Sequence, residues 1–224
     1  MQKLQYKYIT TLAMLYALTL LTCASLIHKF VIIGGHSVSA GSFIIPFWFI
    51  ISDIITEVYG YKTSRKMLWN LLIVGFLAYG VLQLFVLIQK DTPPSGPAYY
   101  YVFGSMLRMY AAMWASLFFA NFINTYLLAK LKIAFHSRHF WIRSIMTSSL
   151  GEILYTAASF MGILGGDVSA ETMMWLIIWG CILKVVITIL FSGLANYITT
   201  ALKKAEGFDI YDTNINFNPF KFEL

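Results

Sequence analysis

Charged residues are scarce in this sequence. Only 12% of its 224 residues are Asp, Glu, Lys or Arg, whereas 59% are hydrophobic and 17% are aromatic. About a quarter of the residues are charged in a soluble domain of ordinary composition. A chain of this length could not hide so much apolar surface from water. The composition therefore excludes an ordinary soluble domain and predicts that lipid surrounds much of the chain.

Cysteine is almost absent. Cys23 and Cys181 both lie in apolar stretches, and neither belongs to a CxxC pattern. This spacing excludes a disulfide framework and the common zinc sites. We expect both thiols to be small packing residues, and we expect no metal site and no cofactor.

The motifs of several enzyme classes are also missing. The sequence contains no HExxH, no GxSxG and no Cys/His constellation, and it lacks the GxxxxGK[ST] phosphate loop. We therefore do not expect an enzyme, and an ATPase that drove this protein would have to be another chain.

Long apolar runs are what the sequence does contain. A helix needs about 20 apolar residues to cross the hydrocarbon core of a bilayer. Six runs qualify, separated by turn-prone segments, at about 8–27, 38–59, 67–89, 106–129, 142–165 and 173–199. The sequence predicts an all-α polytopic membrane protein in which residues 1–224 form a single domain of six transmembrane helices.

The positive charges predict the orientation of these helices. Cytoplasmic loops carry an excess of Lys and Arg. With the N-terminus inside, twelve of the 16 Lys and Arg residues are cytoplasmic, and both termini lie inside the cell. Because the basic residues lie between the apolar runs rather than on one face, the net charge of +6 indicates membrane topology and no nucleic-acid partner.

Four ionisable side chains lie within the predicted spans, where each costs ~2.5–3.5 kcal/mol to insert and is a candidate functional group. Asp53 and Glu57 are four residues apart and share one helix face. By helix rise, Glu152 lies roughly 15 Å deep and Lys184 roughly 16 Å deep, so we expect them to neutralise one another. Pro46 is expected to kink the second span.

Each of these groups also has a structural interpretation. Glu57 could be solvated at the membrane surface, and Glu152 with Lys184 could be a purely structural pair. Asn121 and Asn124 share one face of the fourth span, where they could bind cargo or only join helices by hydrogen bonds. The sequence leaves these alternatives open.

The segment IPFWFIISDIITEVYGYK at 45–62, followed by Arg65, resembles the signature of the queuosine precursor transporters, also called the vitamin uptake transporter family. Further matches are Asn121 and Asn124, Arg143, Lys184 and the tail from Glu206 to Phe220. Tyr155 departs from the family's pattern, which often has Asp near this position. The resemblance covers nearly the whole chain.

This resemblance implies an importer in the bacterial inner membrane. Its cargo would be 7-cyano-7-deazaguanine, 7-aminomethyl-7-deazaguanine or both, the precursors of a modified tRNA nucleoside. A carboxylate can accept the adjacent N–H groups of a guanine-like edge, and aromatic rings can stack on the base. We expect a substrate site formed by Glu152, Lys184, Asn121, Asn124, Trp48 and Tyr155, with coupling or gating by Asp53, Glu57 and Arg143.

Other functions are compatible with the sequence. The chain could be a carrier that works alone, or a substrate-binding membrane subunit of an ATP-driven vitamin transporter. A membrane-embedded enzyme and a pure assembly protein are the remaining alternatives. The lipid bilayer is an expected partner, and both a monomer and a homodimer are open.

Overall fold

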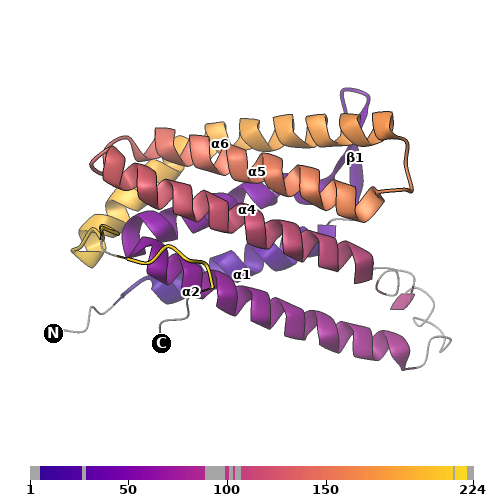
Figure 1. Cartoon of the computed structure of the whole chain (residues 1–224), viewed down its shortest axis with the longest axis horizontal. Helices are drawn as coiled ribbons and strands as arrows, with labels where there is room; N and C mark the ends of the chain where they lie inside the picture. Colours follow the sequence, from indigo (N-terminus) through magenta and orange to yellow (C-terminus); the bar gives the residue numbers. More distant parts are fainter. Residues whose placement is uncertain are drawn as a thin grey trace.

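The computed structural model describes residues 6–26, 29–88, 99–100, 103, 107–213 and 215–220. Its elements are α1 (Ile9–Leu26), β1 (Phe30–Ile33), β2 (His36–Ser39), the 3-10 helix η1 (Ala40–Phe43), α2 (Ile45–Leu87), α4 (Leu107–Ala134), α5 (Phe140–Leu164) and α6 (Ala170–Glu206). The helices form one elongated bundle (Figure 1).

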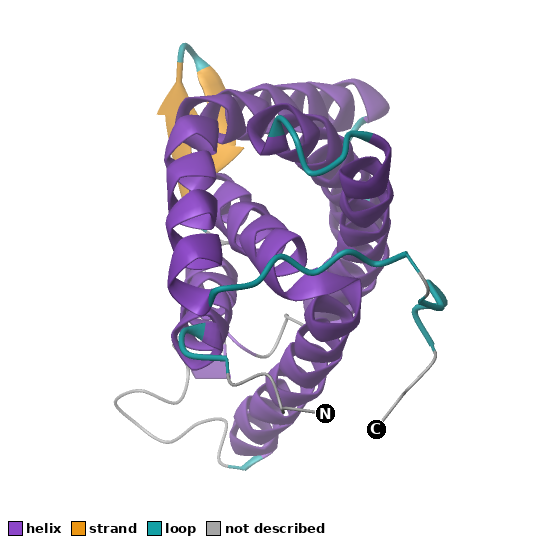
Figure 2. Ribbon diagram, turned by 90° about the vertical axis from the view of Figure 1, so that its left-hand side faces the viewer, coloured by secondary structure: helices purple, strands orange, loops and turns teal. Residues whose placement is uncertain are grey.

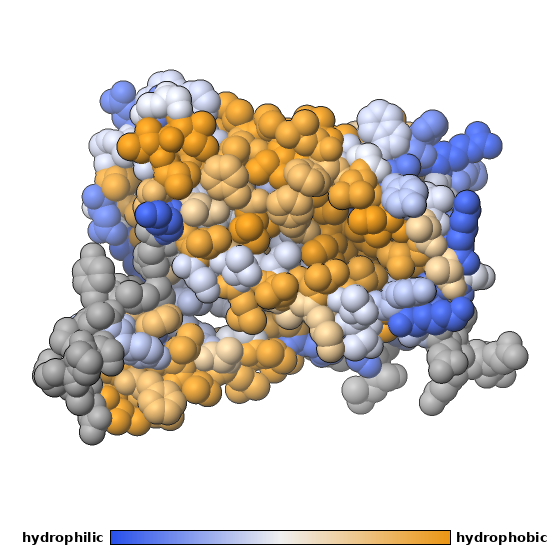
Figure 3. Space-filling view, turned by 180° about the vertical axis from the view of Figure 1, so that it is seen from behind, coloured by the Kyte–Doolittle hydropathy of each residue, from blue (hydrophilic) through white to orange (hydrophobic). Residues whose placement is uncertain are grey.

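Four described helical stretches are long and apolar enough to cross a membrane: Ile9–Leu26, Ala40–Leu87, Leu107–Ala134 and Ala170–Glu206. Helix α5 is also long, but Arg143, Glu152 and many Ser and Thr residues make it more polar. Apolar residues cover the side of the bundle in Figure 3, and hydrophilic residues gather at its two ends. The chain is an all-α, multi-pass membrane protein.

Helix α2 changes direction at Gly60. Its 43 residues are interrupted there by a non-helical backbone conformation with φ 80° and ψ 165°, which glycine adopts most readily. The predicted kink at Pro46 is wrong. Pro46 lies in the first turn of α2, where a proline fits because its missing N–H has no partner within the helix.

The two parts of α2 have different surroundings. Residues 45–59 pass through the centre of the bundle, and Trp48, Phe49 and Asp53 are fully buried. Helix α2 packs against α1, α4, α5 and α6. In residues 61–87, large side chains such as Phe76 and Leu77 are exposed, at 71% and 62%, as expected for a surface that faces lipid.

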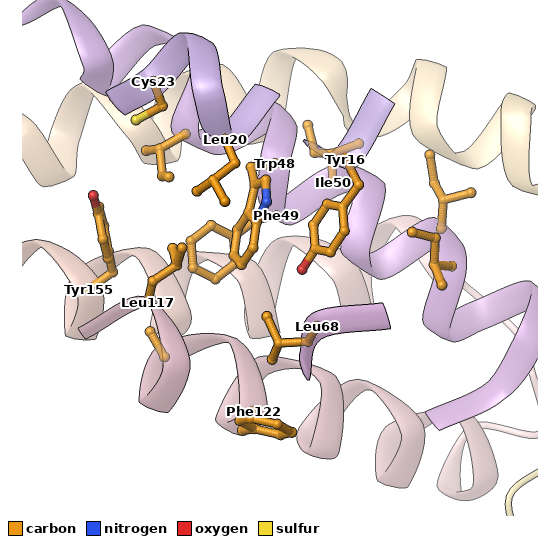
Figure 4. Close-up of a cluster of buried hydrophobic side chains, with 14 of the residues drawn as sticks. Tyr16, Leu20, Cys23, Trp48, Phe49, Ile50, Leu68, Leu117, Phe122 and Tyr155 are labelled. Atoms are coloured by element: carbon orange, nitrogen blue, oxygen red, sulfur yellow. The ribbon is translucent and has the colours of Figure 1, made fainter. Parts of the chain in front are cut away.

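Aromatic rings fill the core beside the buried part of α2 (Figure 4). The Tyr16 ring stacks on Trp48 with 4.6 Å between centroids, and the Trp48 and Phe49 rings meet edge to face at 5.5 Å. Gly151 lets α5 approach closely, because a Cβ there would lie 2.7 Å from a Phe49 ring carbon and 3.2 Å from the Asn124 Cβ.

The hairpin β1–β2 lies at one end of the bundle. Its strands are antiparallel, and Gly34 and Gly35 both have positive φ in the turn, as a tight hairpin turn requires. The His36 ring stacks on Trp179 of α6 with 4.3 Å between centroids. The sequence predicted a turn-prone segment here and a membrane helix from residue 38 onward, so the two strands and η1 before α2 were not predicted.

The opposite end of the bundle brings together both ends of the described chain. The Glu206 carboxylate accepts hydrogen bonds from the backbone N–H groups of Lys7, at 3.0 Å, and Tyr8, at 2.9 Å. The segment after α6, residues 207–220 without 214, is called the C-terminal strap below. It runs as a loop across this end of the helices (Figure 2).

Candidate functional site

Asp53 is a fully buried carboxylate whose described partners are all neutral. The Asn124 amide of α4 donates to its Oδ1 at 2.7 Å. Ser144 and Ser148 of α5 donate to its Oδ2 at 2.5 and 2.7 Å. These two serines are four residues apart, so one face of α5 presents both hydroxyls to α2. Asp53 therefore joins three helices without a counter-charge.

Glu57, one turn later, has cationic partners. Arg143 donates to both of its carboxylate oxygens, at 2.8 and 3.0 Å. Lys203 of α6 donates to Oε1 at 2.7 Å, and Ser137 also donates to Oε1, at 3.2 Å. The side chains of Glu57 and Arg143 are both 0% exposed, so Glu57 is not solvated at the membrane surface.

The C-terminal strap extends this ionic cluster. Lys132 is 1% exposed and donates to Asp209 at 2.5 Å and to the backbone carbonyls of Ile210 and Glu57, each at 2.6 Å. Lys203 also reaches Asp209, at 3.0 Å. Glu57, Arg143, Lys132, Lys203 and Asp209 are called the ionic cluster below. It connects the strap to α2, α4, α5 and α6.

The strap is held along its length by α2. Asp212 accepts the backbone N–H of Tyr61 at 2.8 Å, next to the break at Gly60. Arg65 donates to the carbonyls of Asn216 and Asn218, and the Trp69 indole donates to the carbonyl of Pro219 at 2.8 Å. The strap thus covers this end of the bundle and is held to α2 by polar contacts.

Glu152 and Lys184 lie on neighbouring helices but make no direct ion pair within the described part of the chain. The Lys184 ammonium donates to the Thr156 hydroxyl at 2.6 Å, and that hydroxyl donates to the Glu152 backbone carbonyl at 2.6 Å. The Glu152 Oε1 accepts from Thr188 at 2.7 Å. The two charged groups therefore do not contact each other directly as predicted. Instead, Lys184 contacts the Thr156 hydroxyl of α5, and Glu152 contacts the Thr188 hydroxyl of α6.

A cavity of about 200 Å³ lies at the hairpin end of the bundle. Lys184 and Tyr155 line it together with Cys23, Ser159 and residues of the hairpin and η1. The Lys184 ammonium lies 5.3 Å from the centroid of the Tyr155 ring, within the range of a cation–π contact. The lining is otherwise largely apolar, as is common for small-molecule sites.

Several buried polar atoms near the bundle centre have no hydrogen-bond partner in the described structure. They include the Tyr16 hydroxyl, the Trp48 Nε1, the Asn124 Oδ1 and the Glu152 Oε2. Each such atom costs about 1–3 kcal/mol when left unpaired. Stacking of Tyr16 on Trp48, and the contacts of Gly151 with Phe49 and Asn124, connect α1, α2, α4 and α5 around them. Open donors and acceptors in an apolar core suit a polar ligand or water.

The predicted site residues thus separate into three groups. Lys184 and Tyr155 line the cavity, whereas Glu152 is not part of its lining and is linked to Lys184 through Thr156. Asn124 joins Asp53, and Asn121 exchanges hydrogen bonds with Ser52 at 3.1 and 3.3 Å. The third group comprises Glu57 and Arg143 in the ionic cluster. Trp48 belongs to none of the three groups and packs in the core between Tyr16 and Phe49.

Sequence reasoning missed several residues of these networks. The Ser144 and Ser148 hydroxyls could have been found from their four-residue spacing, which places them on one face of α5. Lys132, Lys203 and Asp209 carried no such signal, because their partners are distant in the sequence and meet only through the strap.

Two comparisons with known proteins indicate the family of this chain. A family model described as "Putative vitamin uptake transporter" matches residues 39–198, which is more than half of the chain. A Bacillus subtilis (strain 168) protein named "Probable queuosine precursor transporter" is 28% identical over 156 residues, covering 65% of this chain and 67% of that protein. No solved structure matches. Both matches are to transporters rather than enzymes, and the chain belongs to the vitamin uptake transporter family.

Proposed function

We propose that this protein imports 7-deazaguanine precursors of queuosine across the bacterial inner membrane. The substrates would be 7-cyano-7-deazaguanine, 7-aminomethyl-7-deazaguanine or both. Family membership and the name of the Bacillus subtilis relative support the class of cargo. The structural observation that carries the proposal is the largely apolar cavity at the hairpin end, which Lys184 and Tyr155 line.

The polar and aromatic groups that line this cavity have the chemistry that a guanine-like base needs. Its edge presents N–H donors next to a carbonyl acceptor. The Lys184 ammonium of this lining can donate to the carbonyl, and the Ser42 and Ser159 hydroxyls of the same lining can accept from the N–H donors. The Tyr155 ring offers an aromatic face at the cavity wall. Edge hydrogen bonds combined with stacking are how proteins commonly hold a single base.

We further propose six spans with both termini in the cytoplasm. In this arrangement the break at Gly60 divides α2 into the second and third spans, and α5 is the fifth span. The ends of α6 provide matched test sites, because Glu171 in its first turn and Lys204 in its last turn are both exposed. Glu171→Cys should be labelled from outside intact cells and Lys204→Cys only after the cells are opened. The reverse pattern would contradict this topology.

With this orientation, the cavity faces the outside and the strap covers the cytoplasmic end. Transport then requires the ionic cluster to rearrange, so that substrate can leave past the strap. Asp53 is suited to coupling, because a carboxylate without a cationic partner can change its protonation or hydrogen bonding at low electrostatic cost to its neighbours.

Cells that cannot synthesise the precursors provide the test. Expression of this protein should restore queuosine in their tRNA when a precursor is supplied at low concentration. A known importer serves as positive control. If the known importer restores queuosine and this protein does not, the substrate assignment is wrong. If restoration requires a separate ATPase module, the chain is the substrate-binding subunit of an ATP-driven transporter.

A further inference from the structure

The cavity at the hairpin end is lined by one ammonium and no carboxylate. Lys184 is 2% exposed, and its side chain reaches the cavity from α6. None of the lining residues is Asp or Glu. The carboxylate on the facing turn of α5, Glu152, is not part of the lining, and one of its oxygens is occupied by Thr188.

The Lys184 ammonium also retains hydrogen-bonding capacity. It has three N–H donors, and in the described structure it donates one hydrogen bond, to the Thr156 hydroxyl. Thr156 directs its own hydrogen to the Glu152 carbonyl, so it acts toward Lys184 only as an acceptor. Two N–H donors thus remain for a ligand, and the Tyr155 ring holds the ammonium beside the cavity.

We propose that Lys184 makes this cavity a charge-selective binding site, which admits neutral heterocycles bearing hydrogen-bond acceptors and excludes organic cations. This inference rests on the proposed function and specifies its substrate. In a 7-substituted 7-deazaguanine, the carbonyl oxygen and the C7 substituent project from the same edge of the bicycle. An ammonium that donates to the carbonyl therefore lies next to the substituent. A nitrile there can accept a hydrogen bond, whereas an aminomethyl group is cationic and repelled. The neutral 7-cyano compound is the preferred cargo.

Cys23 offers a probe that does not depend on the cargo, because its thiol lines the same cavity. In a Cys181→Ala background, the rate of Cys23 modification is measured with two ethyl methanethiosulfonates, one carrying a sulfonate and the other a trimethylammonium group. A local charge changes the approach rate of charged reactants by about 10-fold or more. We expect the sulfonate reagent to react about tenfold faster.

Variants of Lys184 show whether this residue causes the faster reaction of Cys23 with the sulfonate reagent. Lys184→Met should abolish the preference, and Lys184→Arg should keep it. Lys204→Met, the same substitution at an exposed site on α6, should change nothing. If Lys184→Met fails to fold, the ratio of the two Cys23 modification rates in the parent protein and in Lys184→Arg still tests the proposal. Equal rates for the two reagents, no modification at all, or a preference unaffected by Lys184→Met would overturn the proposal.

Protection of Cys23 by the precursors tests the substrate. The 7-cyano compound should slow modification, and the 7-aminomethyl compound at the same concentration should slow it about tenfold less. Equal protection by both would overturn the selectivity. Protection by neither, with the reagent preference still dependent on Lys184, would leave the charge-selective cavity supported and instead contradict the proposed cargo.

Discussion

Glu57 and Arg143 form a two-point ion pair inside the bundle, with both side chains at 0% exposure and nitrogen–oxygen distances of 2.8 and 3.0 Å. The two residues are 86 positions apart, so this pair fixes the register of α2 against α5. It also lies directly beneath the strap, because Lys203 contacts both Glu57 and Asp209.

Breaking this pair on one side should destabilise the protein strongly. Glu57→Gln leaves the Arg143 guanidinium buried without a counter-charge, which costs about 3–5 kcal/mol. We expect a marked fall in the temperature at which half of the detergent-solubilised protein remains monodisperse. The double variant Glu57→Leu with Arg143→Met should be less damaging than Glu57→Gln, because it leaves neither charge of the pair. A double variant that is less stable than Glu57→Gln would show that the unpaired charge is not the main source of the destabilisation.

Gly60 should not tolerate a side chain. Its φ of +80° disfavours L-residues, and an added Cβ would lie 2.9 Å from Ile210 and 3.0 Å from Asp212 of the strap. Backbone strain of this kind costs about 1–3 kcal/mol, so Gly60→Ala should lower thermal stability. Gly80→Ala is the matched control, because Gly80 lies in the same helix with nothing within 4 Å of its Cβ position. Similar stability of the two variants would contradict the conformation assigned to Gly60.

Asp53→Asn should impair turnover more than binding. The variant places an amide donor where Asn124, Ser144 and Ser148 already donate, and it removes the charge needed for coupling. Uptake should fall by about tenfold or more, equivalent to 1.4 kcal/mol. Substrate affinity should change little, since Asp53 does not line the cavity. Ser148→Ala removes one donor and keeps the charge, so its effect on uptake should be smaller. Normal uptake by Asp53→Asn would exclude a coupling role.

Attachment of the strap should weaken in acid. Burial favours a raised pKa for Asp209, but the hydrogen bonds and charges of Lys132 and Lys203 outweigh it and hold the pKa of this carboxyl below its ordinary value. A carboxyl whose pKa is lowered by folding stabilises the fold above its unfolded pKa. That contribution is lost as the pH falls through the folded value, here below about pH 4.

Nitroxide labels at Lys66 and Thr213, both exposed, can follow this release. Their distance distribution should be narrow at neutral pH and broaden in acid. Asp209→Asn should be broad at both pH values. Asp167→Asn, which alters an exposed ion pair with Arg108 at the other end, should behave like the parent. An acid transition that persists in Asp209→Asn would show that another group controls the strap.

The sequence predicted an all-α membrane protein correctly, because the lengths of apolar runs reflect bilayer thickness. Four described helical stretches are long and apolar enough to cross a membrane, and the six-span topology stays a prediction. The sequence placed Asp53 and Glu57 on one helix face correctly. It could not show that neutral amide and hydroxyl groups bind Asp53, whereas a guanidinium binds Glu57. The position of Pro46 was misread because a proline at the start of a helix and one in its interior look alike without the helix boundary. The contacts of Asp209 with Lys132 and Lys203 depend on the path of the strap across the bundle, which local sequence patterns do not predict.

Uptake by proteoliposomes that contain this chain alone tests the central claim most directly. Labelled 7-cyano-7-deazaguanine should accumulate to a saturable level above that of empty liposomes, without ATP or another protein, and Asp53→Asn should reduce the rate. Uptake indistinguishable from that of empty liposomes, with protein of unchanged thermal stability, would contradict the account of this chain as a self-sufficient carrier of queuosine precursors.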